Sequence, residues 1–539
     1  MDRRSLLLST AAGAAAALAA PAVLRRPALA QTVAPGTLTV GVRTGPESMD
    51  PHWSTLGGHI EALRHVYDSL VGQDEKLGLR PALATSWRAV GDDAWEFTLR
   101  EGVRFHDGSE FTAEDVKFSL DRIPVVTGPM PMTLYTKRVR GSEVVDARTI
   151  RVTTDGPAPT LPNDFTRLMI LPRRLGMEVR NEAFNAGGNV AVGTGPFRYV
   201  RWEPRGDLVV ERFDGWWGGR QPWARVIRRE IPNDAARVAA LKSGGVDLIN
   251  YVPATDVAAL RRDPTMDAVV GDSVYVFNVS FTLAEKLPRP VKVDGREVEA
   301  NPFRDPRVRL AMDLAIDRRA LARVVFEGLA KPMSQLMPDD FFGASPNLPE
   351  RRPDLARARA LMAEAGYPRG FEVDFHSTAN RLPGDGPLCE ALAQQWARIV
   401  PGMKVNPMPT VGTVFFPASQ RGEYSLQMSG WGTLTGEAAY TYGALLHGPD
   451  PSVGLGNFNR SGYSNPEVNR LLLDGSRTLD EARRREMFVR ATEISMEERP
   501  MLPVVMPQTV WAMPKGRLSF APRVDQETLA HLVTPNAAR

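Results

Sequence analysis

The chain has 539 residues, more than one ordinary hydrophobic core holds, so two or three domains are expected. Its composition, 43% hydrophobic and 24% charged, is that of a globular protein. The net charge of +3 is carried by residues 1–30, which contain four arginines and one aspartate. The remainder is formally neutral and has no basic stripe, so the composition gives no reason to expect nucleic-acid binding.

Residues 1–30 have the features of an export signal. Residues 3–7 (RRSLL) are similar to a twin-arginine motif, an Ala-rich run follows, and residues 28–30 (ALA) form a small-residue cleavage site. A membrane anchor is disfavoured because the apolar run is about two-thirds of the roughly 20 residues that a spanning helix needs. We therefore expect a signal peptide of the twin-arginine type and a soluble periplasmic mature protein.

A small α/β unit is predicted between residues 66 and 123. Trp95, Phe97 and Leu99 alternate with polar residues, which is the pattern of a half-buried strand. Thr112 is expected to cap the following helix, with Asp115 as the reciprocal partner in a capping box.

Five segments stand in one order within the same stretch: 66–68 (VYD), 81–87 (PALATSW), 97–100 (FTLR), 102–108 (GVRFHDG) and 112–116 (TAEDV). Together they resemble the signature region of extracytoplasmic solute-binding proteins of ABC importers, in the peptide/nickel/opine class. So many matches in one order make the resemblance specific. It implies an α/β, two-lobe periplasmic-binding-protein fold of type II, in the large class with an extra subdomain in lobe 1 and a ligand cleft between the lobes.

Two later segments extend the resemblance. Residues 193–196 (GTGP) match a turn of the family; a phosphate loop is disfavoured because Pro196 lacks a backbone donor and no Gly-Lys-Ser/Thr ending follows. Residues 305–318 match a family pattern in which Asp305 and Asp317 are expected to cap consecutive helices.

The resemblance also implies a division of the mature chain. One hinge strand is expected at about residues 271–278, and residues 503–510 are expected to return the chain to the first lobe. The predicted units are 31–76, 193–275 and 503–539 for the core of lobe 1, 77–192 for its extra subdomain, and 276–502 for lobe 2.

Cys389 is the only cysteine, so an internal disulfide is impossible and no cysteine after the signal could carry a lipid anchor. It precedes an Ala-, Leu- and Trp-rich helical run at residues 390–400. We expect a buried structural thiol rather than a nucleophile.

Two groups of ligand residues are predicted. In the resembling family, a Leu-Asp-Pro loop lies at the mouth of the cleft; here Ser48, Met49 and Asp50 occupy it, with methionine in place of leucine. The alternative is a simple Asp-Pro turn.

The second group follows the Gly-Trp at residues 430–431. In peptide-binding relatives an aspartate follows within a few residues and pairs with the α-ammonium of the peptide. Here Glu437 is the only acid between Trp431 and Tyr442, so either it does the same job or the ligand has no free ammonium. Trp431 is expected to stack on the ligand or, alternatively, to be a core residue. The predicted set is completed by Thr433, Tyr440 and Phe458.

No catalytic motif is found: the sequence lacks Gly-x-Ser-x-Gly, Ser-x-x-Lys and His-Glu-x-x-His, and His106-Asp107 is an adjacent pair in a turn. We therefore expect no catalytic residue, metal or cofactor.

The leading hypothesis is a solute-binding subunit that captures a peptide or peptide-like solute by hinge closure and delivers it to the membrane subunits of an ABC permease. We expect a monomer that binds no nucleic acid. An opine, glycoside or metal chelate as ligand, a sensory subunit, and an exported enzyme remain as alternatives.

Overall fold

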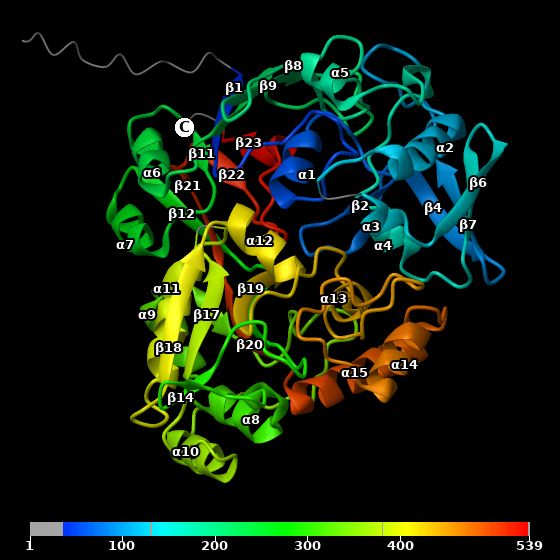
Figure 1. Ribbon diagram of the computed structural model, residues 1–539. Coiled ribbons are helices and arrows are strands. Elements are labelled where there is room, and N and C mark those ends of the chain that lie inside the picture. The colour runs from blue at the N-terminus through cyan, green and yellow to red at the C-terminus, as the bar shows by residue number, and fades with distance from the viewer. Residues whose placement is uncertain (1–35, 130–131, 380, 537–539) are drawn as a thin grey trace, which may run out of the picture.

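The computed structural model describes residues 36–129, 132–379 and 381–536, and the predicted signal peptide lies outside them. The described chain forms two large sheets and a separate four-stranded sheet, each packed against its own hydrophobic core (Figure 1). The predicted α/β class is confirmed.

A seven-stranded sheet forms the first lobe. Its central strand β1 is parallel to both neighbours, and nearly all of its residues are buried, as expected for a strand covered on both faces. Helices α1 (Gly57–Leu63), α5 (Asn181–Ala186), α6 (Asp234–Lys242) and α7 (Ala254–Arg262) belong to this part of the chain. In sheet order the strands are β12 (Met266–Gly271), β21 (Thr509–Pro514), β11 (Leu248–Ile249), β1 (Thr37–Val42), β10 (Arg225–Glu230), β9 (Asp207–Arg212) and β8 (Phe197–Trp202).

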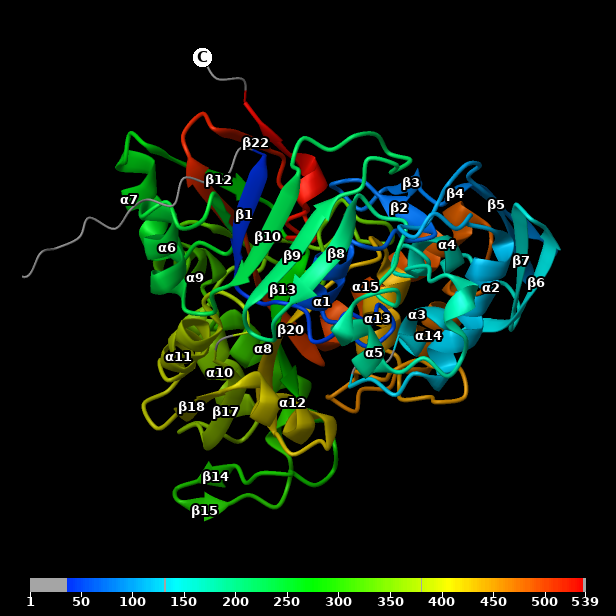
Figure 2. The ribbon, with the colours of Figure 1, turned by 90° about the horizontal axis from the view of Figure 1, so that it is seen from above.

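A four-stranded antiparallel sheet forms a smaller unit beyond the β8 edge of the first sheet (Figure 2). Its helices are α2 (Ala113–Arg122), α3 (Thr133–Thr136) and α4 (Leu161–Asp164). Two short strand pairs stand apart: β2 (Val71–Gln73) with β3 (Leu79–Pro81), and β22 (Leu518–Phe520) with β23 (Val533–Pro535). The four strands, in order, are β4 (Ala84–Val90), β5 (Ala94–Leu99), β7 (Thr149–Thr154) and β6 (Val139–Asp146).

An eight-stranded sheet forms the second lobe. Its strands in order are β15 (Arg296–Glu297), β14 (Lys292–Val293), β17 (Glu372–Thr378), β19 (Leu426–Gly432), β13 (Tyr275–Phe281), β20 (Met501–Pro507) and β16 (Ala330–Pro332), and β18 (Lys404–Thr410) pairs with β17. Its helices are α8 (Pro306–Leu314), α9 (Arg318–Val324), α10 (Leu355–Glu364), α11 (Asp385–Trp396), α12 (Gly412–Gln420), α13 (Ala438–Leu445), α14 (Pro466–Gly475) and α15 (Glu481–Glu498).

Local hydrogen bonds start the helices where the sequence predicts. The Thr112 N–H donates to Asp115 at 2.8 Å within the predicted capping box of α2. Asp305 accepts from the first turn of α8, and Asp317 accepts from the Ala320 N–H at 2.8 Å in α9. These caps satisfy N–H groups that have no partner inside the helix.

The chain crosses between the two large sheets twice. The first crossing is residues 272–274, between β12 and β13, and lies inside the predicted hinge strand. The second is Gln508, whose side chain donates to Asp272 of the first crossing at 3.0 Å. This corrects the expected return to lobe 1 at residue 503, because β20 pairs with β13 and β16 in the second sheet and only β21 joins the first.

Cys389 lies within α11 rather than before it, and it is fully buried. Its environment raises the thiol pKa to about 11, because burial disfavours the thiolate. The prediction of a buried thiol is confirmed. Among the described helices, none is both long and apolar enough to cross a membrane.

Candidate functional site

Most of the predicted ligand residues meet where the second lobe faces the first lobe and the smaller subdomain. Trp431 lies on β19, opposite Val276 of β13, and the chain then turns directly into α13. This short connection brings Thr433, Glu437 and Tyr440 to one end of the sheet. Figure 1 shows α13 between the second sheet and the subdomain.

Aromatic rings connect the two sides of this interface. The Trp431 ring centroid is 5.4 Å from that of Tyr440 and 5.1 Å from that of Phe458. Tyr440 in turn stacks on Tyr135 of the subdomain, at 6.4 Å and an interplanar angle of 8°. Tyr440 thus contacts both sides of the interface, which favours a role in the site over simple packing inside one lobe.

Hydroxyl groups fix the orientation of Trp431. Its indole N–H donates to Thr441 Oγ1 at 3.1 Å, and the Thr441 hydroxyl is 2.8 Å from that of Thr433. Thr433 is fully buried and its hydroxyl is used in this chain of bonds. Thr433 therefore positions Trp431 in the described structure.

Glu437 does not present a free carboxylate. It is 5% exposed and forms an ion pair with Arg484 of α15. Burial raises the pKa of Glu437, and the neighbouring Arg484 guanidinium opposes this shift. Since its charge is already compensated, the geometry disfavours the first alternative, in which Glu437 pairs with an ammonium of the ligand; whether the ligand has a free ammonium stays a prediction.

The other predicted group lies inside the first lobe. Asp50 accepts two hydrogen bonds from Arg122, at 2.9 and 2.5 Å, and both residues are buried. Met49 is a core residue with no exposed surface, and Ser48 contacts Asn185 at 3.0 Å. This placement separates residues 48–50 from the Trp431 cluster and favours the alternative of a structural turn.

Arg381 is a candidate site residue that the sequence analysis missed. It precedes α11, and its Nη1 donates to the Gly430 carbonyl at 2.6 Å, next to Trp431. Desolvation lowers its pKa, and the hydroxyl of Tyr275 and the carboxylate of Asp385 oppose this shift. Its guanidinium carbon also lies 5.2 Å from the centroid of the Phe416 ring. No carboxylate of the described residues lies within 4.0 Å of its guanidinium. No local pattern around residue 381 distinguishes it from other arginines.

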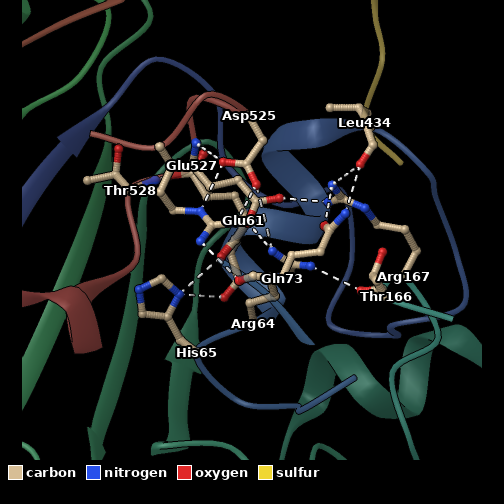
Figure 3. A network of polar contacts seen from close by, with 12 residues as sticks. Glu61, Arg64, His65, Gln73, Thr166, Arg167, Leu434, Asp525, Glu527 and Thr528 are labelled. Carbon is tan, nitrogen blue, oxygen red and sulfur yellow. Dashed lines mark hydrogen bonds and ion pairs between the residues drawn. The ribbon is translucent and has the colours of Figure 1, made fainter. Parts of the chain in front are cut away.

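A buried polar network links residues 433–437, the loop between β19 and α13, to the first lobe (Figure 3). Arg167 donates to Glu527 at 2.8 Å and to the Leu434 carbonyl at 3.0 Å, and Gln73 donates to the same carbonyl at 3.3 Å. Arg64 also donates to Glu527, at 2.6 Å. Leu434 directly follows Thr433 in the second lobe. These bonds therefore join the loop that contains Thr433 to the first lobe and to the subdomain.

A cavity of about 50 Å³ lies between the subdomain and the second lobe. Tyr440 and Phe458 line it from the second lobe, so it adjoins the Trp431 cluster. The subdomain contributes Lys137 and Asp164. Burial raises the pKa of Asp164 from its ordinary value of 3.8 to about 7.

His106, the histidine of the adjacent His-Asp pair, has the contacts of a structural residue. His106 Nε2 is 2.9 Å from the Gly195 carbonyl, and burial lowers the pKa of the ring to about 4. Within the described ranges, no three His, Cys, Asp or Glu side chains gather as metal ligands would.

Residues 78–452 match the family described as bacterial extracellular solute-binding proteins, family 5 Middle. The glutathione-binding protein GsiB of Escherichia coli O1:K1 is 27% identical over 492 residues, covering 90% of this chain and 91% of that protein.

Two solved structures have a similar fold. DppA from Helicobacter pylori in complex with the peptide STSA has a TM-score of 0.77 and 24% identity, covering 93% of this chain and 98% of that one. AgaA from A. tumefaciens R10 in complex with agropinic acid has a TM-score of 0.75 and 25% identity, covering 94% and 99%. These likenesses confirm the predicted two-lobe binding-protein fold.

Proposed function

Because the chain belongs to family 5 of the bacterial extracellular solute-binding proteins, we propose that it captures a small peptide or peptide-like solute between its lobes and delivers it to an ABC permease. The observation that carries this proposal is Arg381, a half-buried cation at the interface that has no carboxylate within 4.0 Å among the described residues. GsiB is a glutathione-binding protein and DppA was solved in complex with a peptide, which supports a solute of this class.

Arg381 binds a carboxylate of the solute in this proposal. A partly buried cation gains from an anionic partner, and a guanidinium offers two parallel donors to a carboxylate. Trp431 and Tyr440 cover the solute, since both rings lie at the same end of the second sheet. Glu437 stays paired with Arg484. A peptide-like solute that holds its ammonium elsewhere, or has none, fits this arrangement.

Closure moves one lobe toward the other about the crossings at residues 272–274 and 508. The bonds from Arg167 and Gln73 to the Leu434 carbonyl form in the closed state. In the proposed division, residues 36–76, 193–271 and 509–536 form the core of lobe 1, residues 77–192 its extra subdomain, and residues 275–507 lobe 2. Helix α5, near the end of the subdomain segment, packs on the core of lobe 1 through Phe184.

The protein works outside the cytoplasm in this proposal, as a soluble periplasmic monomer released after cleavage of residues 1–30. Its role is binding rather than catalysis, without cofactor and without nucleic acid. Amino-terminal sequencing of periplasmic protein checks the processing, and a start at or near Gln31 is expected.

Titration calorimetry with glutathione, the peptide STSA and agropinic acid tests the function. We expect at least one of them to bind, and at 100 times Kd to stabilise the protein by about 2.7 kcal/mol. Arg381→Gln should weaken binding about 10- to 100-fold, since a hydrogen bond to a charged group contributes about 1.5–3 kcal/mol. The matched control is Arg369→Gln, whose side chain is 73% exposed at an ion pair with Asp294.

Small-angle scattering with and without the bound solute checks closure. A smaller radius of gyration with solute is expected. A rigid shape in every condition, together with no binding of any solute tested, would contradict the proposal. Binding of agropinic acid alone would identify an opine as the ligand class.

A further inference from the structure

The cavity between the subdomain and the second lobe has a polar lining that the proposed function does not use. The Thr435 hydroxyl is in a residue only 2% exposed and has no hydrogen-bond partner in the described structure. Arg477 Nε is likewise buried without a partner among those residues. Both residues line the cavity. A buried donor left unpaired costs about 1–3 kcal/mol, so an acceptor is expected to fill this position in the functional state.

Cations outnumber anions around the cavity. Neither Arg477 nor Lys137 has a carboxylate within 4.0 Å in the part of the chain that is described, and the Lys137 ammonium donates only to the Gly454 carbonyl, at 3.0 Å. Arg138, which also lines the cavity, is paired with Asp155. Arg477 therefore has no carboxylate partner among the described residues, and Lys137, an exposed residue, brings a second cation to the cavity wall.

Asp164 is the one carboxylate that lines the cavity, and it does not neutralise both cations. Its closest polar contact is the Thr160 hydroxyl at 3.3 Å. Burial raises its pKa to about 7, so the protonated form, which can donate a hydrogen bond to an incoming anion, is favoured relative to an exposed aspartate. The cavity thus combines three kinds of donor, from Thr435, Arg477 and Lys137, with an acid that can become a fourth.

We propose that this cavity is a second subsite that binds a carboxylate of the solute, in addition to the carboxylate held by Arg381. The inference rests on the proposed function and narrows its ligand to small peptides or peptide-like solutes with two carboxylates, such as a peptide with an aspartate or glutamate side chain.

The size and position of the cavity agree with this assignment. A volume of about 50 Å³ admits a few water-sized groups and is too small for a whole peptide. Tyr440 separates the cavity from Trp431 and lies near enough to Arg381 to affect its charge. The cavity lining includes Tyr440 but not Arg381, so in this proposal one extended solute passes Tyr440 between Arg381 and the cavity.

The test offers the protein a mixture in which anionic and neutral solutes compete. A peptic digest of casein with added glutathione is equilibrated with the full mature chain, the protein is recovered by ultrafiltration, and retained solutes are released with acid and identified by mass spectrometry. The variants are Arg477→Gln and Thr435→Val, and Arg470→Gln is the control, because Arg470 is an exposed residue of helix α14, which ends just before Arg477, and it pairs with Asp474. Unfolding midpoints verify that each variant is folded.

Wild type should enrich solutes with an acidic side chain about tenfold or more over their neutral counterparts. Arg477→Gln should abolish this enrichment and Thr435→Val should reduce it, while both still retain solutes with one carboxylate; Arg470→Gln should match wild type. Equal retention of acidic and neutral solutes by wild type, or undiminished enrichment in folded Arg477→Gln, overturns the subsite and leaves the proposed function standing. Retention of no solute by wild type overturns the proposed function, and the subsite with it.

Discussion

Buried charges occur both in the first lobe around Asp50 and at the cavity between the subdomain and the second lobe, but their surroundings differ. Asp50 accepts hydrogen bonds from Nη1 and Nη2 of Arg122 and from the backbone N–H of His52, the last at 3.0 Å, so its carboxylate is satisfied even though Arg122 Nε has no partner in the described structure. At the cavity, Arg477 has no carboxylate partner among the described residues, and its Nε and the Thr435 hydroxyl are buried without partners.

This difference separates structural from functional charge. A carboxylate that is satisfied inside one lobe has little to gain from a solute, whereas an unpaired donor between two units gains a partner when the solute arrives. Residue type alone does not make this distinction, because Asp50 and Glu437 both satisfied the sequence pattern for ligand contact. Substitutions at three residues and the pH dependence of a fourth test this comparison.

The largest effect is expected at Asp50. Asp50→Ala leaves Arg122, which is 1% exposed, as an uncompensated buried cation and should cost about 3–5 kcal/mol. The measurement is the shift of the urea unfolding transition of the first lobe. Asp121→Ala is the control, since the Lys117–Asp121 pair has side-chain exposures of 39% and 47% and should contribute less than about 1 kcal/mol. Equal effects of the two substitutions would contradict the structural role of Asp50.

Glu437→Gln should have the next largest effect on stability. The amide keeps one acceptor for Arg484 but loses the charge, which should cost about 1.5–3 kcal/mol. Thermal unfolding measures this change, and solute affinity of the folded variant should remain within a few-fold of wild type. Lost affinity at unchanged stability would instead show that Glu437 meets the ligand, as the sequence predicted.

Arg477→Met should stabilise the ligand-free protein, whereas a substitution that breaks a satisfied ion pair destabilises it. Removing a buried donor that has no partner relieves a desolvation cost, so the ligand-free protein should gain up to about 1 kcal/mol. Thermal unfolding without solute checks the gain, with Arg484→Met, which breaks the pair with Glu437, as the destabilising comparison. A large loss of stability in Arg477→Met would show that its charge has a structural partner.

The smallest effect is a pH dependence at Asp164. Burial raises its pKa from 3.8 to about 7, so the folded state binds more protons than the unfolded state between these values, and its contribution to stability falls as pH rises through that window. The charged groups facing it are Lys137, Arg138 and Glu437. Affinity for solutes with two carboxylates should weaken a few-fold from pH 6 to 8, and Asp164→Asn should remove this slope. Calorimetry over that range measures both, and an unchanged slope in the variant would assign it to another group.

The sequence predicted those parts of the fold that depend on neighbours in the chain. The capping box of Thr112 and Asp115 joins residues three apart, and Asp305 and Asp317 cap helices through residues that follow within one turn. Alternation across Trp95, Phe97 and Leu99 similarly identified β5. The return strand was misplaced because β20 and β21 are consecutive, similarly apolar strands, and only their pairing partners distinguish the two sheets.

The sequence by itself determined the family, the α/β class and most of the cluster around Trp431, because Trp431, Thr433 and Tyr440 lie on one strand, turn and helix that follow one another directly, whereas Phe458 joins them from beyond α13. Tertiary structure alone decided which charges are free. Arg122 reaches Asp50 from 72 positions away and Arg484 reaches Glu437 from 47, whereas Arg381 and Arg477 meet no carboxylate among the described residues. The physical reason is that the cost of a buried charge depends on every group packed around it, and those groups come from segments that are distant in the chain.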